Sequence, residues 1–343
     1  AQANVGSSTY DPAVDYHLAC CRMGCISSVF DCGFPAVDAC IGKRGKTAAR
    51  DAQVKVCCPF FLVVLQHGSH GSARDWHNVE ITLRAKWSRA PRLASVPMEI
   101  FLPRSVEHLR TDRGLVSCGI DLAAELAKKI REVRERYPSL TLHISFVAHS
   151  FGGPLVRHAL MLLHSGSHLD GVHLATFATL ASPHVGIRGM RPFLRMGARL
   201  AGNLFSTAYA DLALTTTAFD QLCEEEALAP LRRFRRRMLF ADVRKDFLVS
   251  LQTGGLVPEL PDHSKVPERG GHVCPMVLLM PQDAACPSLE APGALPPLHS
   301  SAAHAFSSCD DPDGQRARRA ARMLCTLRTV GPWCLYPVRF PEL

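Results

Sequence analysis

The sequence has no long uninterrupted apolar run: residues 60–65 form one of the longest in its 343 residues. A helix needs roughly 18 or more apolar residues in a row to cross a bilayer, so we expect no membrane-spanning helix. Gly and Pro number 24 each, close to average usage, which excludes collagen-like and low-complexity chains. Hydrophobic residues make up 47% and charged residues 20%, so the chain can bury a sizeable core.

A strong charge of one sign is also missing, because 39 basic and 31 acidic side chains leave a net charge of +8. Arginine is concentrated in residues 232–237 and 316–322. Such runs attract phosphates or anionic lipid, but more often they are solvated helix ends. Since no nucleic-acid recognition motif accompanies them, we expect no nucleic-acid partner.

The 14 cysteines include no C-x-x-C pair, and the H-E-x-x-H motif is absent. We therefore expect no metal site, and nothing in the sequence calls for a cofactor. Seven of the cysteines precede residue 59, in a region without helical or strand periodicity, so we predict a Cys-rich extension over residues 1–58, outside the fold. No secretory signal is visible, but the chain begins with Ala1, so a missing start is expected. Localisation stays open, with the cytoplasm or a membrane surface favoured.

From residue 59 onward, apolar segments of strand length alternate with segments of helical spacing. This alternation predicts an α/β fold: a doubly wound, mostly parallel sheet with helices on both faces. One helix is indicated by Ile120, Ala123, Leu126, Ala127, Ile130 and Val133, and it ends at Tyr137-Pro138. The predicted strands cover residues 60–65, 98–102, 142–147, 172–180, 238–243, 276–280 and 333–340.

The segment Ala148-His149-Ser150-Phe151-Gly152 lies between a predicted strand and a predicted helix. A nucleophilic serine needs small residues two positions before and after it, because the sharp strand-to-helix turn crowds the neighbouring backbone. Ala148 and Gly152 meet this need, so Ser150 is the candidate nucleophile. The Phe151 N–H, at the start of the helix, is one candidate oxyanion donor. The competing interpretation is an ordinary Ser-Gly turn that ends a strand.

The turn at residues 67–71, after the first strand, is the expected source of a second oxyanion donor. We favour the N–H of Ser69, with His67 shaping the loop, over an ordinary glycine turn without a catalytic role.

Three segments carry a family resemblance: Leu65–Gly68 with Gly71 and Asp75-Trp76, then Ile144–Gly153, then Phe177–Gly189. They resemble, in order, the markers of the "putative serine esterase" (lipase-like) family of α/β-hydrolases, and with later matches they cover about residues 60–340. The resemblance implies an α/β-hydrolase fold, a serine ester hydrolase and a lipid or acyl-ester substrate.

The segment Phe240–Val249 resembles the strand and loop that bear the family's acid, which points to Asp246. Asp242 is the second candidate, and a surface pairing of Asp246 with Arg244 or Lys245 is the non-catalytic alternative. Chain order offers His299 or His304 as the base. The resemblance instead places the base after the last strand, so we expect it beyond Leu343, with His304 as the fallback. The hydrolase domain is then residues 59–343, truncated at its end and carrying a Pro-rich insertion at about 257–311.

Residues 187–205 combine apolar and arginine positions. They suit either a lid that meets a membrane surface or a helix packed on the sheet. If the base is truly absent, the alternative function is a non-catalytic hydrolase scaffold that binds lipid or protein.

Overall fold

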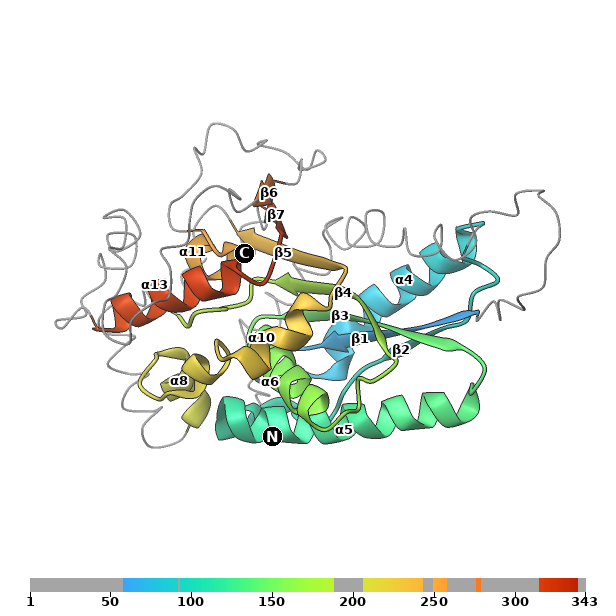
Figure 1. The fold of residues 1–343 in the computed structure, drawn as a ribbon, viewed down its shortest axis with the longest axis horizontal. Coiled ribbons are helices and arrows are strands. Elements are labelled where there is room, and N and C mark those ends of the chain that lie inside the picture. The colour runs from blue at the N-terminus through green and yellow to red at the C-terminus, as the bar shows by residue number, and fades with distance from the viewer. Residues whose placement is uncertain are drawn as a thin grey trace, which may run out of the picture.

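The computed structural model describes residues 58–91, 93–187, 206–242, 249–257, 276–278 and 315–338. Within these ranges a seven-stranded sheet has the order β2-β1-β3-β4-β5-β7-β6 (Figure 1). The pairings are parallel except that between β6 and β7. The strands are β1 (Pro59–Gln66), β2 (Met98–Phe101), β3 (Thr141–His149), β4 (His173–Leu180), β5 (Arg236–Asp242), β6 (Met276–Leu278) and β7 (Trp333–Val338).

Both faces of this sheet are covered, which explains why β1 is apolar at nearly every position. Phe60, Leu62 and Val64 face one core, while Val63 and Leu65 face the other. A strand buried on both sides cannot show the polar alternation of a half-exposed strand. The predicted doubly wound, mostly parallel sheet is confirmed.

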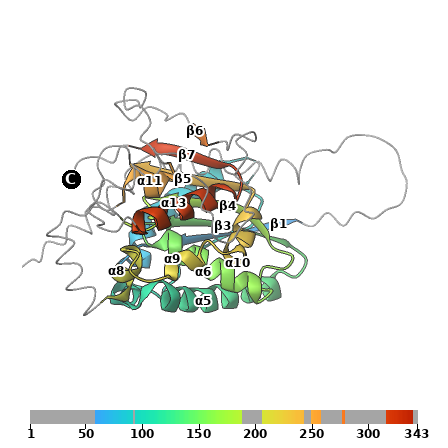
Figure 2. The ribbon, with the colours of Figure 1, turned by 60° about the vertical axis from the view of Figure 1, so that its left-hand side comes forward.

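Helices of the larger core are α5 (Gly114–Arg136), α6 (Gly152–Ser165), α10 (Glu225–Arg232) and α13 (Gln315–Arg328). Figure 2 shows α5, α6 and α10 on one side of the strands. On the opposite face α4 (His77–Arg89) buries Val79 and Leu83. The shorter helices are η1 (Ala73–Trp76), η2 (His108–Arg113), α8 (Thr207–Leu212), α9 (Ala218–Gln221) and α11 (Leu251–Gly255). No described helix is both long and apolar enough to cross a membrane.

The strand order reverses beside β1: the chain passes from β1 to β2 on one side, then returns to β3 on the other. In open α/β sheets, ligands bind at such a switch point, outside the carboxyl ends of the strands. The segments that follow β1 and β3 therefore face the expected site. They are the turn after Gln66 and the turn that contains Ser150.

One detail of the helix prediction is wrong. Helix α5 begins at Gly114, six residues before Ile120, and Ile120 is 51% exposed. The predicted positions Ala123, Leu126, Ile130 and Val133 are buried, and the same face continues toward the helix start through Leu122, Cys118 and Leu115. The predicted end is confirmed, since α5 stops at Arg136, just before Tyr137.

Candidate active site

Ser150 occupies the turn between β3 and α6 with a backbone φ of 49°. A non-glycine residue rarely adopts this left-handed conformation, which costs free energy and is common at active sites. Two hydrogen bonds hold it: the Ser150 N–H donates to Leu180 O at 2.9 Å, and the Gly153 N–H donates to Ser150 O at 3.1 Å. A strained strand-to-helix turn of this kind is the geometry that a nucleophilic serine needs.

Glycine is required at positions 152 and 68 because other segments come too close for a side chain. A Cβ at Gly152 would lie 2.4 Å from His67 O and 2.8 Å from Gln66 O. A Cβ at Gly68 would lie 2.8 Å from the Ser150 Cβ. The turn after β1 is thus packed directly against the serine turn, and this close packing is the reason that position 152 needs a small residue.

The turn after β1 is closed by a hydrogen bond from the Gly71 N–H to Gly68 O at 3.2 Å. Ser69 lies in its middle and is partly exposed. Phe151 is fully buried and immediately precedes α6. Within the described part of the chain, no hydrogen bond uses the backbone N–H of Ser69 or of Phe151.

Polar side chains shape the two ends of the same turn. His67 is 1% exposed, and its Nδ1 lies 3.0 Å from Gly68 O. Asp75 accepts a hydrogen bond from the Ser72 N–H at 2.8 Å, which caps η1. Trp76 is buried in the smaller core. The motif residues around Gly68 thus fold the turn and attach it to the sheet.

The loop after β4 packs on the opposite side of the serine turn. A Cβ at Gly153 would lie 2.6 Å from the Ser182 Oγ. His184 is fully buried, its Nε2 lies 2.9 Å from the Thr179 Oγ1, and burial holds its pKa well below 6.5. His184 is therefore a neutral structural residue. Within the described residues, no histidine is hydrogen-bonded to Ser150.

A buried arginine holds this loop in place. Arg157 of α6 donates from Nη1 to His184 O at 2.9 Å and from Nη2 to Leu222 O at 2.7 Å. Burial lowers the pKa of its guanidinium. No sequence motif singled out Arg157, since its partners are carbonyl groups contributed by distant residues.

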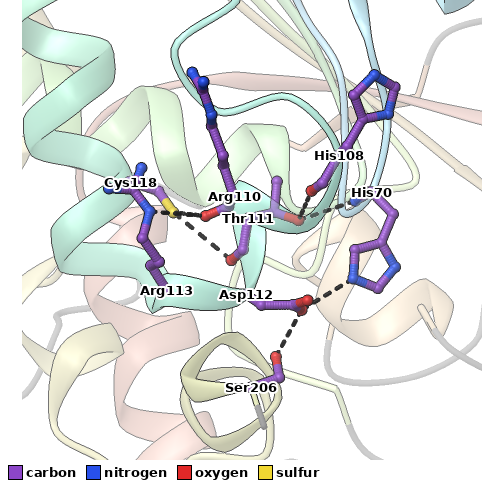
Figure 3. A network of polar contacts seen from close by, with 8 residues as sticks. All are labelled: His70, His108, Arg110, Thr111, Asp112, Arg113, Cys118 and Ser206. Carbon is purple, nitrogen blue, oxygen red and sulfur yellow. Dashed lines mark hydrogen bonds and ion pairs between the residues drawn. The ribbon is translucent and has the colours of Figure 1, made fainter.

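A second network, which the sequence did not indicate, contacts the turn after β1 (Figure 3). The His70 Nε2 lies 2.9 Å from the Asp112 Oδ1, and the Ser206 Oγ donates to the same oxygen at 2.9 Å. His70 belongs to the turn after β1, and Asp112 belongs to η2. The chain positions are 42 residues apart, so no local spacing could reveal the contact.

Several predicted site residues lie outside the described residues: Asp246, His299, His304 and the arginine-rich stretch 188–205. Residues 1–57 and most of the predicted insertion also lie outside them. Asp242 is described: it is the last residue of β5 and is 8% exposed. The structure thus places Gly68, the neighbour of Ser69, against Ser150, with Phe151 directly after the serine. The catalytic roles of all these residues, like the acid and the base, stay predictions.

Comparison with known proteins agrees with this geometry. Residues 59–260 match a family model described as "Putative serine esterase (DUF676)". "Putative lipase C4A8.10" of Schizosaccharomyces pombe is 26% identical over 225 residues, which cover 61% of this chain and 27% of that protein. "Putative lipase YDR444W" of Saccharomyces cerevisiae is 27% identical over 173 residues, covering 43% of this chain and 25% of that protein. The chain spans about a quarter of the length of these relatives.

Solved structures give more distant matches. "Phospholipase PlaB from Legionella pneumophila in complex with thio-NAD" has a TM-score of 0.41 at 15% identity, covering 57% of this chain and 43% of that chain. The mature form of Bacillus licheniformis lipase BlEst2 has a TM-score of 0.38 at 17% identity, covering 61% of this chain and 83% of that chain.

Proposed function

Because the chain belongs to the family described as "Putative serine esterase (DUF676)" and has an α/β-hydrolase fold, we propose that it is a serine ester hydrolase acting through an acyl-serine intermediate. The observation that carries this proposal is the strained backbone of Ser150, at φ 49°, on the switch point of the sheet. A turn that merely ends a strand gains nothing from such strain, whereas a nucleophile gains exposure from it.

In the proposed reaction, the Ser150 Oγ attacks the acyl carbonyl and loses its proton to a histidine. The Ser69 and Phe151 N–H groups stabilise the negative oxygen of the tetrahedral intermediate, because both are unpaired and flank Ser150. Asp246 orients the histidine, which then donates its proton to the leaving alcohol. Water releases the acyl group in a second, equivalent step. His299, His304 and a residue beyond Leu343 are the candidates for the base.

We propose a lipid or another acyl ester as the substrate, since the relatives are named as lipases. Contact with a membrane surface is supported by exposed apolar side chains around the start of α5: Leu109 is 74% exposed, and Ile120 is 51% exposed. Arg110, beside Leu109, is also exposed. Apolar and cationic side chains together favour the surface of an anionic bilayer.

Flotation with anionic vesicles tests the membrane part of the proposal. Leu109→Asp is expected to reduce vesicle binding, whereas Ile81→Asp is the matched control because Ile81 is 53% exposed on α4, across the sheet. Equal binding by the two variants would contradict a contact centred on Leu109.

Fluorophosphonate labelling tests the catalytic part. The wild-type protein should take up one label, Ser150→Ala should take up none, and the exposed Ser167→Ala should be labelled like the wild type. Hydrolysis of p-nitrophenyl esters of increasing chain length then gives the acyl preference. A wild-type protein that stays unlabelled, under conditions that label a known serine hydrolase, would leave the non-catalytic scaffold as the better explanation.

A further inference from the structure

The turn that carries Ser69 is attached to η2 and the residues just before it by several hydrogen bonds. The His70 N–H donates to the Thr111 Oγ1 at 3.0 Å, and the His108 N–H donates to Gly71 O at 2.9 Å. The Ala73 N–H donates to the Glu107 Oε1 at 2.8 Å. These bonds come from a segment 34 to 41 residues further along the chain, so they join two elements that would otherwise move independently.

Asp112 is the centre of this attachment (Figure 3). One of its carboxylate oxygens, Oδ1, lies 2.9 Å from both the His70 Nε2 and the Ser206 Oγ. Ser206 immediately precedes α8. A single carboxylate oxygen therefore connects the turn after β1, η2 and the start of α8. Hydrogen bonds to an ionised acceptor are shorter and stronger than neutral ones, which suits a contact that fixes geometry.

The turn needs this restraint because His70 itself is strained, with φ 55°. A non-glycine residue relaxes out of the left-handed region unless neighbouring contacts hold it. Here the N–H of His70 is fixed by Thr111 and its ring by Asp112, on either side of the same Cα. Rotation of the His70 backbone would turn the Ser69–His70 peptide, which carries the Ser69 carbonyl. Because the bond from the Gly71 N–H to Gly68 O closes the turn around Ser69, such a rotation would also shift the Gly68–Ser69 peptide, which carries the Ser69 N–H. The orientation of the Ser69 N–H thus depends on the contacts of its neighbour.

We propose that Asp112 and His70 are positioning residues for the oxyanion site: their pairing holds the Ser69 N–H toward the oxygen that becomes negative at Ser150. This inference rests on the proposed esterase function. Neither residue touches the substrate in this assignment, and both act through the backbone of the turn.

The expected signature is a lower kcat with little change in KM, since an oxyanion donor acts mainly on the transition state. Removal of one such donor costs about 100- to 1,000-fold in kcat, so its misplacement by Asp112→Ala should cost about 10- to 100-fold. Asp112→Asn should recover most of the rate, because the amide oxygen still accepts from His70. Asp121→Ala is the matched control: Asp121 is a nearby carboxylate of α5 that pairs with Arg113, and among the described residues it has no hydrogen bond to the turn.

A double-mutant cycle separates positioning from a general loss of structure. His70→Gly removes the ring while keeping the left-handed backbone accessible. If the two side chains act through one bond, Asp112→Ala should have little further effect on kcat in the His70→Gly background. Additive losses in kcat, or an Asp112→Asn variant as slow as Asp112→Ala, would overturn the proposal.

The restraint can also be measured without turnover, by hydrogen exchange at the His70 amide. Asp112→Ala should accelerate this exchange, whereas Asp121→Ala should not. Unchanged exchange and an unchanged kcat would overturn the positioning role while leaving the esterase proposal intact. A wild-type protein that is not labelled at Ser150 refutes the esterase proposal itself, and faster exchange in Asp112→Ala would still show that the restraint exists.

Discussion

Replacing Ser150 by glycine should stabilise the fold while removing the proposed nucleophile. The reason is the φ of 49°, which a residue with a Cβ adopts only at a cost. The left-handed conformation costs about 1–2 kcal/mol for an L-residue and almost nothing for glycine. The greater freedom of glycine in the unfolded chain removes about 0.4–1 kcal/mol of this gain. Ser150→Gly should therefore exceed Ser150→Ala in stability by up to about 1.6 kcal/mol, since alanine keeps the strain.

The measurement is thermal or urea unfolding of both variants beside the wild type. For a domain of this size, 1 kcal/mol corresponds to a shift of about 2–4 °C in Tm. Two further serines act as controls. Ser167, in an exposed turn with φ 57°, should gain from Ser→Gly without loss of activity. Ser117→Gly, at an exposed position within α5, should lower stability by about 0.5 kcal/mol, because glycine has a lower helix propensity than serine.

The strain argument fails if Ser150→Gly is no more stable than Ser150→Ala while Ser167→Gly behaves as expected. In that case the left-handed backbone at Ser150 would be a relaxed conformation, and it could no longer be used as evidence for a nucleophile. Failure of Ser167→Gly as well would instead mean that the general cost assigned to this conformation is too large.

Three further predictions concern packing and charge. Gly152→Ala should lower the free energy of unfolding by about 1–3 kcal/mol and also lower activity, because the new Cβ would lie 2.4 Å from His67 O, which is 0.6 Å closer than the 3.0 Å below which real Cβ contacts essentially never occur. Gly254→Ala is the control: its nearest contacts would be at 3.4 Å, so it should be tolerated in unfolding and activity assays. Burial lowers the pKa of His143 to about 4, so the stability that its neutral ring contributes is complete above pH 6.5 and is lost as the pH falls toward 4. In His143→Phe, the free energy of unfolding measured in urea should therefore depend less on pH over that range. Arg157→Met should cost about 2–4 kcal/mol in urea unfolding, because two buried carbonyl oxygens lose their donors; wild-type stability in this variant would contradict that role.

The strands could be predicted closely from the sequence because their burial on both sides leaves continuous apolar runs. β1 was predicted as residues 60–65 and is observed as Pro59–Gln66, and β3 was predicted as 142–147 and is observed as Thr141–His149. The Ser150 turn was predictable for a related reason. The residues that a sharp turn permits, Ala148 and Gly152, stand within two positions of the serine.

The start of α5 could not be predicted, because distant residues determine it. The Leu115 N–H at its first turn donates to the Asp211 Oδ2 at 2.7 Å, across 96 positions of the chain. Gly119 looks like a helix breaker in the sequence. In the structure the lack of a side chain at Gly119 leaves room for His158 of α6, because a Cβ at position 119 would lie 2.3 Å from the His158 Nδ1. Local propensity therefore cannot locate this helix start, because contacts with distant residues determine it.

The candidate site likewise combines features that the local sequence predicts with features that depend on distant residues. The groups proposed to react are encoded locally, since Ser150 and Phe151 are adjacent and the turn around Ser69 follows a recognisable strand. The contacts that orient them are encoded at long range, as the 42 positions between His70 and Asp112 show. A relative could thus keep every motif residue and still lose activity through a change at Asp112. If the positioning proposal is correct, identifying an active member of this family requires the residue at position 112 as well as the serine motif.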